Sequence, residues 1–481
     1  MRSRTPLHAG AVSVFAALCV VFAGCAAPEY VPPEVHRPAG PLTLDGVVEL
    51  ALRNNPGLAA AGSRVEAARA AIDEAWAAYL PVLQLFGRFT QADMPSRTFG
   101  TILDQERFSN AIDFNDPGVT RNWHPGIGGG ITLYDGGRRW HRARAAEAGA
   151  AAEDAALDAA RRDIAYEAAR AYFLVHKARD AAAAHEAAAE NLAVQVRIAE
   201  ARRGEGALRG ADVLGVAARL ADARHAAVAA RGSAVRAETG LRILLGLGAA
   251  EELALVPPAL DAPPARPALD ACIVRARERR PEIDRARLMF EAARAQADAA
   301  HAGWFPDVTI FGEFGFDARK PSIGHPNWLW GVEAVESVFD AFKTPLRVRQ
   351  AMARVAEAHA AGRAVVLDVE RDVVHALLDA EEADARGAAA AGEERLAVEA
   401  LRVAEVELAE GKAAPARVLD RKAALTAARA RLAAAAHDRT FSRIALAHAT
   451  GEYPPCRVDV AGGDPPGGRP PASGLLTENS R

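Results

Sequence analysis

The pattern of hydrophobic and polar positions changes at two places in the chain, in each case just after a proline. Behind Pro81 and behind Pro306 the residues alternate with a period of two over about ten positions. This alternation predicts two β-strands, each preceded by a helix that ends at the proline. One face of these strands carries large apolar side chains: Leu83, Leu85 and Phe89; Val308, Ile310, Phe314 and Phe316. The opposite face carries the polar residues: Gln84 and Arg88; Asp307, Thr309 and Glu313.

Two further segments predict the partner strands. They are WHPGIGGGITLYD, from Trp123, and WLWGVEAVESVFD, from Trp328, and the second would place Glu336 on its apolar face. Tryptophan at the end of an alternating segment is typical of a strand that crosses a membrane, because aromatic side chains gather at membrane interfaces. A soluble amphipathic hairpin has the same period, so the strands alone leave both interpretations open.

The residues between the strands predict very long helices. From about Arg138 to about Arg203 there is neither a proline nor a cluster of turn residues, and a helix of that length would be on the order of 100 Å long. We expect the chain to turn at Gly206, and at Gly411 in the second half, and to return through another helix. Such lengths favour a coiled-coil tube or bundle over one compact domain.

The two halves of the chain are copies of each other. Residues 44–89 align without a gap with residues 269–314, and residues 133–246 align with residues 338–451. Each copy reads as helix, strand, strand, long helix and helix, with Thr43 or Asp45 as the expected cap of the first helix. The first copy has about 20 extra residues between its strands, and its YDGGRR segment corresponds to FDAFKT in the second, without the glycine pair.

The N-terminal segment has the features of an export signal. Arg2 and Arg4 precede an apolar stretch, AVSVFAALCVVFAG, that ends directly before Cys25. The letters FAGC resemble a lipobox, in which the cysteine is lipid-modified, with palmitate among the expected acyl chains; an ordinary signal peptide with an incidental cysteine is the alternative. In lipoproteins of this type, alanine after the cysteine implies export to the outer membrane. The proline-rich residues that follow favour an extended tether.

Composition and motifs argue against several classes of function. The formal net charge of -4 and the mixing of acidic with basic residues make nucleic acid a poor partner. The chain has no P-loop, H-E-x-x-H or G-x-S-x-G motif, and its 13 histidines are scattered, mostly on expected polar helix faces. We therefore predict neither an enzyme nor a metal or cofactor site.

After the signal no apolar run reaches about 18 residues, so no transmembrane helix is expected. Cys272 and Cys456 could form a disulfide in an oxidising compartment, but two unrelated thiols fit their spacing better.

Taken together, these features resemble the TolC-type outer-membrane efflux proteins, specifically their lipoprotein-bearing members. The resemblance rests on the start LTLDGVVELALRNNPGL, the proline–strand junctions, the segment ITLYDGGRRWHRARAAEA, the Gly-x6-Val-Leu turn and the duplication, and it covers about residues 42–453. It implies a mainly α-helical subunit with four strands, in a trimer whose twelve-stranded transmembrane β-barrel continues as an α-helical periplasmic tunnel. Pro81 and Pro306 would mark the two places where a periplasmic helix becomes a membrane strand.

The signal, the composition of the flanking segments and the two repeats predict how the chain is divided. The expected parts are a lipoprotein signal peptide (1–24), a tether (25–41), a first efflux repeat (42–250), a linker (251–268), a second repeat (269–453) and a disordered tail (454–481). The extra loop of the first repeat, from about residue 90 to about residue 122, would lie outside the cell.

In that family the helical tips narrow the periplasmic entrance, and rings of acidic residues there favour cations. Asp212 matches the first-repeat aspartate of the contacts that hold the closed state, and Asp420 matches one aspartate of the entrance ring. Arg417 stands where a second ring aspartate is usual. The alternative for Asp420 is a solvated carboxylate paired with Arg417 or Arg421.

The function implied is that of a passive exit duct, lipid-anchored in the outer membrane and extending into the periplasm. A homotrimer would release small molecules such as drugs, which an inner-membrane transporter delivers through a periplasmic adaptor protein. Type I protein secretion and metal efflux are alternatives within the family. A different alternative is a periplasmic coiled-coil lipoprotein that acts as a tether and forms no channel.

Overall fold

The computed structural model describes residues 34–38, 40–206, 208–260, 267–410, 412 and 415–453. The chain divides into two compact units, Met1–Arg37 and Pro38–Arg481, and everything below concerns the second. The signal peptide with Cys25, most of the tether, part of the linker, Gly411, Cys456 and the C-terminal tail lie outside the described residues. In the described part of the chain, none of the helices combines the length and the apolar character needed to cross a membrane.

Each repeat contains the expected order of helices and strands. The first repeat consists of α2 (Leu44–Asn54), α3 (Pro56–Ala77), β1 (Val82–Ala92), α4 (Pro95–Asp104), β2 (Thr120–Tyr134), α5 (Arg138–Gly204) and α6 (Gly210–Leu244). The second consists of α7 (Leu269–Arg279), α8 (Pro281–His301), the 3-10 turn η1 (Ala302–Trp304), β3 (Asp307–Asp317), β4 (His325–Val335), α9 (Lys343–Ala409) and α10 (Pro415–Ala449). The helices α5 and α9 have 67 residues each, which makes them on the order of 100 Å long, as the sequence predicts.

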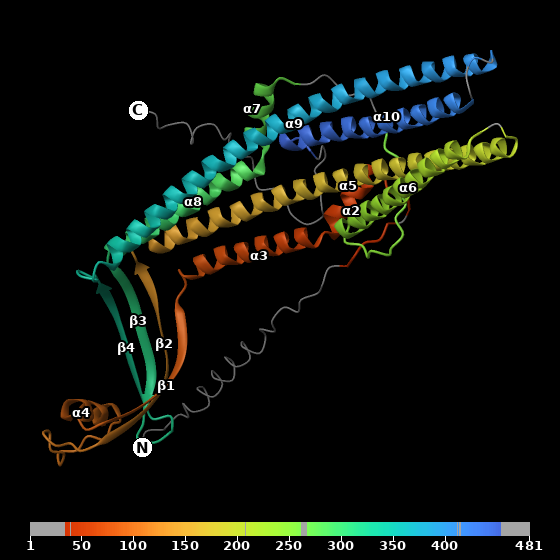
Figure 1. Cartoon of the computed structure of the whole chain (residues 1–481). Coiled ribbons are helices and arrows are strands. Elements are labelled where there is room, and N and C mark those ends of the chain that lie inside the picture. The colour runs from red at the N-terminus through yellow and green to blue at the C-terminus, as the bar shows by residue number, and fades with distance from the viewer. Residues whose placement is uncertain are drawn as a thin grey trace. The chain divides into compact units, whose positions relative to one another are not determined.

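The four strands form one antiparallel sheet in the order β1-β2-β3-β4. The pairing of β2 with β3 joins the two repeats, and a bulge between Thr132 and Tyr134 interrupts this pairing near its end. Figure 1 shows the sheet at one end of the long helices. Within the described residues β1 and β4 are the edge strands.

The helices follow the same lateral order as the strands from which they continue. Helix α5 packs against α3 and α8, and α8 packs against α9, so the wall of strands is continued by a wall of helices. The return helices pack on the long ones, α6 on α5 and α10 on α9, and α10 also contacts α5. Alanine is the commonest buried residue of α5, which lets neighbouring helix backbones approach closely.

Larger hydrophobic side chains gather where the short helices α2 and α7 cover the long ones. One cluster joins α2, the middle of α5 and the end of α6, and includes Val47, Leu50, Tyr172, Phe173 and Leu241. A second cluster joins α7, α9 and the end of α10, and includes Cys272, Ala276, Val369, Val373 and Leu446. Each repeat therefore buries its own core beside its long helix.

The opening helix of each repeat is broken, which the sequence analysis did not predict. Thr43 caps α2 as expected, because its hydroxyl oxygen accepts a backbone N–H of the first turn at 3.3 Å. The helix then ends before Pro56, whose ring cannot continue a regular helix, and the Asn55 side chain caps α3 by accepting a backbone N–H at 2.8 Å. Pro281 begins a new helix in the same way in the second repeat.

Three other expectations about the strands are corrected. The helices end at Ala77 and His301, before Pro81 and Pro306, so these prolines lead into the strands and do not end the helices. Strand β4 ends at Val335, so Glu336 lies beyond the strand and not on its apolar face. The extra loop of the first repeat holds a helix, α4, whose ten residues show no signal that the alternation analysis could detect.

Candidate functional site

One face of the sheet is apolar, and the other carries the polar side chains together with Phe86, Phe311 and Leu329; the strand register aligns each face across all four strands. The second face is called the polar face below. One row of the apolar face consists of Leu85, Ile127, Phe314 and Trp328. The outermost row of the polar face that spans all four strands consists of Arg88, His124, Asp317 and His325. Such a division is typical of strands that separate lipid from a water-filled lumen.

Glycines of β2 make room on the polar face. A Cβ atom at Gly126 would lie 2.7 Å from Cζ of Phe86 and 2.6 Å from the backbone oxygen of Phe314. Phe86 in turn stacks on the ring of His124, with 5.4 Å between the ring centroids. This role cannot be predicted from alternation, which indicates the face that a residue occupies but not how closely its neighbours approach.

The junction between helix and strand in the first repeat is fixed by a buried ion pair. Pro81 directly precedes β1, and Asp135 and Arg139, both buried, lie where β2 passes into α5. The Asp135 carboxylate accepts from Nε of Arg139 at 3.1 Å, and the Arg139 guanidinium also donates to the Ala78 backbone oxygen at 3.2 Å. The guanidinium lies over the Tyr79 ring at 4.4 Å. These contacts tie the start of α5 to the segment between α3 and β1.

In the second repeat, Pro306 directly precedes β3 and Asp340 takes the place of Asp135. The Asp340 carboxylate accepts from the Thr344 hydroxyl at 2.7 Å and from the backbone N–H groups of Lys343 and Thr344 at 3.0 and 2.7 Å. The bond from the Thr344 hydroxyl is the main cause that lowers the pKa of Asp340. This junction is a helix cap without the buried arginine of the first repeat.

The turn into the long helix keeps the same backbone conformation in both repeats, although its residues differ. Gly136 and Gly137 have φ angles of 69° and 84°, and Ala341 and Phe342 have φ angles of 55° and 63°. A Cβ atom at Gly136 would lie 2.7 Å from the Ala302 backbone oxygen, so only glycine fits there. The second repeat therefore adopts, without glycine, a left-handed conformation that is costly for other residues.

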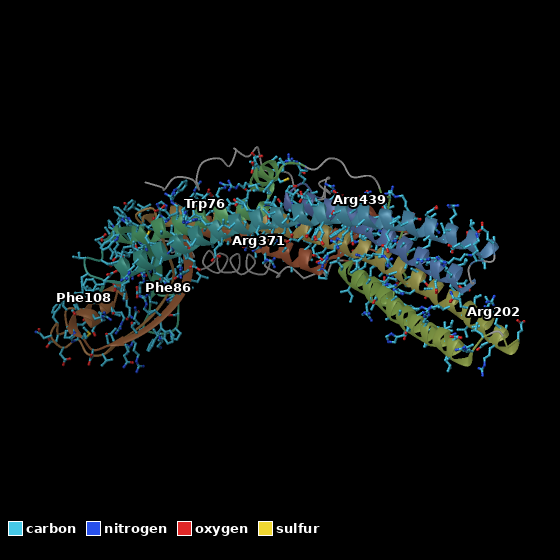
Figure 2. All side chains as sticks on the ribbon, turned by 45° about the horizontal axis from the view of Figure 1, so that its top comes forward. Trp76, Phe86, Phe108, Arg202, Arg371 and Arg439 are labelled. Carbon is cyan, nitrogen blue, oxygen red and sulfur yellow. The ribbon has the colours of Figure 1, made fainter. Side chains whose placement is uncertain are left out.

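The tips of the helical hairpins lie at the other end of the second unit from the sheet. Gly206, with a φ of 73°, forms the turn between α5 and α6, and the exposed Asp212 lies in the first turn of α6. Figure 2 shows Arg202, near this turn, at the opposite end from Phe86 on β1. The corresponding residue of the second repeat, Gly411, lies outside the described residues.

Asp420 has a different partner from the two that the sequence suggests. Its Oδ1 atom lies 3.6 Å from Nη1 of Arg219 on α6, so the pair joins the return helices of the two repeats. Arg417 instead pairs with Glu407 at 2.8 Å. Both side chains of the Asp420–Arg219 pair are more than half exposed, so the pair contributes little to stability.

One ion pair and two histidine–carboxylate contacts connect α5 of the first repeat with α10 of the second. Lys177 Nζ lies 2.6 Å from the Asp438 carboxylate, and Asp163 and Asp180 pair with histidines, His448 at 3.1 Å and His437 at 2.8 Å. His437 is 4 % exposed, and His176 is buried beside it with a ring-centroid distance of 6.4 Å.

Burial is the main cause that lowers the pKa of His176, and the positive charge of Arg179 and the proximity of His437 act in the same direction. His176 and His437 are exceptions to the expectation that the histidines lie mostly on polar helix faces. Their burial depends on contact between the repeats, which spacing along one helix does not reveal.

Comparison with known proteins agrees with this geometry. The family model described as "Outer membrane efflux protein" matches residues 47–247 and 272–452, most of both repeats. No curated relative matches the sequence.

Solved structures of several bacterial membrane proteins are similar to this chain. A membrane protein from Pseudomonas aeruginosa superposes with a TM-score of 0.72 and 22% identity, over 88% of this chain and 99% of that one. The CmeC outer membrane channel of Campylobacter jejuni gives a TM-score of 0.74 at 16% identity, over 88% and 94% of the two chains. The outer membrane protein VceC of Vibrio cholerae gives 0.68 at 22% identity, over 85% and 96%. These matches confirm the predicted fold class, a mainly helical chain with a β-barrel part.

Proposed function

Because this chain belongs to the outer membrane efflux protein family, we propose that it is a passive exit duct for small molecules, drugs among them. The observation that carries the proposal is the two-faced sheet at the end of very long helices. An apolar face with Leu85 and Trp328 suits contact with lipid, and a polar face with Arg88 and Asp317 suits a water-filled lumen. The alternative function, a coiled-coil tether, does not require a sheet with an apolar face.

The duct requires three copies of the chain. The edge strands β1 and β4 leave backbone groups that need a partner, and pairing β1 of one subunit with β4 of the next closes a ring of twelve strands. The helices α3 and α9 occupy the corresponding edges of the helical wall. Closure of the strands would therefore bring α3 of one subunit beside α9 of its neighbour and continue the barrel as a tunnel.

The periplasmic end of the tunnel is the entrance. In this proposal the hairpin turns at Gly206 and Gly411 surround the opening, and Asp212 and Asp420 line it. Three carboxylates around one axis concentrate negative potential in a narrow mouth and favour cations. The Asp420–Arg219 pair supports a ring whose attraction for cations can change. A carboxylate paired with a guanidinium attracts passing cations less than an unpaired carboxylate does.

The energy for transport would come from outside this chain. In this proposal an inner-membrane transporter supplies the substrate through a periplasmic adaptor protein that binds the helical tips. A lipid on Cys25 would hold the chain at the outer membrane, with residues 25–41 as a tether between the anchor and the first repeat. The prolines at 81 and 306 would lie at the inner surface of that membrane.

The experiment that tests the proposal is cysteine scanning along β3 in protein reconstituted into lipid vesicles. Thr309→Cys and Glu313→Cys place a thiol on the polar face, and Ile310→Cys and Phe314→Cys place one on the apolar face. We expect a charged, water-soluble maleimide to label the first two and to leave the second two unmodified. Equal labelling at all four positions would contradict the duct and favour a soluble sheet.

A further inference from the structure

The extra loop of the first repeat folds as an ordered cap, defined here as residues 93–119. Its helix α4 ends with paired hydrogen bonds, from Glu106 N to Leu103 O at 2.8 Å and from Arg107 N to Ile102 O at 2.9 Å. This is a helix-ending motif in which the residue at the position of Glu106 adopts a left-handed conformation, here with a φ of 50°.

Aromatic side chains hold the rest of the cap against α4. The ring of Phe99 lies 5.8 Å from that of Phe108 and 4.7 Å from that of Phe114, measured between centroids. Thr98, which is fully buried, donates its hydroxyl hydrogen to the Ala92 backbone oxygen at 3.0 Å and so fixes α4 to the end of β1. Figure 2 shows Phe108 beyond Phe86 of the sheet. The cap is therefore a folded element that continues outward from the strands.

Polar contacts fasten the cap across the end of the sheet. Gln105, which is 2% exposed, donates to the Asn122 side-chain oxygen of β2 at 2.9 Å. On β4, Asn327 donates to the Asp104 backbone oxygen at 3.2 Å, and His325 Nδ1 lies 3.1 Å from the Glu106 carboxylate. The cap leaves the sheet between β1 and β2, so these contacts carry it across to the far edge strand.

All three of these strand residues, Asn122, His325 and Asn327, belong to the polar face. Asn122 continues the alternation that places His124 on this face, and His325 lies opposite Asp317 in the register of β3 with β4. Asp317 is 5% exposed and accepts hydrogen bonds from Asn122 and, at 2.7 Å, from Asn327. The same carboxylate that organises the end of the polar face therefore also orients the residues that hold the cap.

From this geometry we infer that the cap is a lid over the outer mouth of the lumen, which limits the size of the molecules that leave. The inference rests on the proposed duct, in which the polar face lines the lumen. In a trimer three such lids would converge on the axis from three sides. In the second repeat the corresponding connection is the short segment 318–324, so only the first repeat supplies this element within the described residues.

Glu106 provides a variant that releases the lid without weakening its fold. Glycine is the residue best suited to the left-handed position at the end of α4, so Glu106→Gly removes the contact with His325 and relieves backbone strain at once. Asn327→Ala removes the second contact on β4. Asp116→Asn is the matched control, because it removes a carboxylate from the exposed part of the same cap.

The test measures access to the lumen from outside intact cells that express the full chain. In a Cys456→Ser background, Gln84→Cys reports on the polar face near the helical end of β1, and Ser322→Cys reports on the exposed connection between β3 and β4. The buried Cys272 stays in place. Each thiol is treated with a small charged maleimide and with a maleimide coupled to a polymer of several kilodaltons.

With the native cap, we expect the polymer reagent to label Ser322→Cys readily. Relative to the small reagent, it should label Gln84→Cys at least about tenfold more slowly, a difference of roughly 1.4 kcal/mol in the barrier to labelling. The double variant Glu106→Gly with Asn327→Ala should remove most of this difference, and Asp116→Asn should leave it unchanged. Polymer labelling of Gln84→Cys that is equally fast in the native and released forms would overturn the lid and leave the duct intact. If the small maleimide labels Gln84→Cys neither with the native cap nor with the released cap, the duct itself is overturned.

Discussion

Asp420 on α10 and Arg219 on α6 form an exposed ion pair at 3.6 Å, which joins the return helices of the two repeats. Both helices belong to hairpins whose tips form the entrance in the proposed duct. The pair therefore connects the residue expected to attract cations with a residue that can neutralise it.

Removal of Arg219 should make the entrance more cation-selective. Arg219→Ala leaves the Asp420 carboxylate without its cationic partner, so the ratio of cation to anion permeability should rise. Asp420→Ala should lower the same ratio below that of the unmodified protein. The reversal potential across a bilayer in a salt gradient measures both effects.

Stability provides the control for these two variants. An exposed pair of this kind contributes about 0–1 kcal/mol, so neither substitution should change the thermal unfolding temperature appreciably. If both variants keep the native selectivity, Asp420 does not line the narrowest part of the entrance.

His176 should make the contact between α5 and α10 weaker in acid. A histidine whose pKa is lowered by burial binds a proton less readily in the folded state than in the unfolded state. Its contribution to stability is therefore present above the unfolded pKa of about 6.5 and is lost as the pH falls through the folded value.

His176→Gln removes this titration while keeping a polar side chain of similar size. The difference in unfolding temperature between the native protein and the variant should shrink or change sign as the pH falls from about 7.5 to about 5.5. Arg179, Asp180 and His437 surround His176 and remain in both proteins, so the comparison isolates His176. A difference that is constant with pH would show that His176 does not titrate differently on folding.

Gly126 should be intolerant of any side chain. In Gly126→Ala the new methyl group would meet the Phe86 ring and the Phe314 backbone oxygen at less than 3 Å, and overpacking of this kind costs about 1–3 kcal/mol. At Gly87, on the opposite face of β1, a Cβ atom would meet no atom of the described residues within 4 Å. Gly87→Ala is thus the matched control, and denaturation in detergent should separate the two variants. Equal stability of both would contradict the close packing at Phe86.

Gly137 tests the turn into the long helix of the first repeat. Its φ of 84° is unfavourable for alanine, so Gly137→Ala should destabilise the protein by about 1–2 kcal/mol even though the new Cβ atom has room. Gly149→Ala, inside α5, should instead stabilise it by about 0.5–1 kcal/mol, because glycine is a poor residue for a helix interior. Changes of opposite sign in the free energy of unfolding of the two variants would confirm the left-handed turn, and a stabilising Gly137→Ala would contradict it.

The parts of the fold that the sequence predicts are those with a regular period. The four strands follow from alternation after Pro81 and Pro306 and in the two return segments, and the long helices follow from the uninterrupted residues after Arg138. The duplication adds weight to both, because the same pattern recurs at corresponding positions of the two repeats. The helix α4 was missed because its ten residues are too few for a clear period, and its position depends on polar contacts with β4.

The parts of the candidate site that were missed depend on contacts between segments far apart in the chain. The alternative interpretation of Asp420 pairs it with Arg417 or Arg421, its neighbours along the helix, but the packing of the hairpins brings it to Arg219. His176 and His437 lie on different repeats, and the contact of α5 with α10 brings their rings together. Sequence spacing identifies neighbours on one helix or strand, and it does not determine which faces of two long helices meet.

The central claim is that three copies of this chain enclose a continuous water-filled path. It is tested most directly by the single-channel conductance of the purified protein in planar lipid bilayers, together with its oligomeric mass in detergent. We predict a stable trimer that inserts into the bilayer and carries a steady, cation-selective current. A monomer that remains in solution and carries no current would contradict the claim.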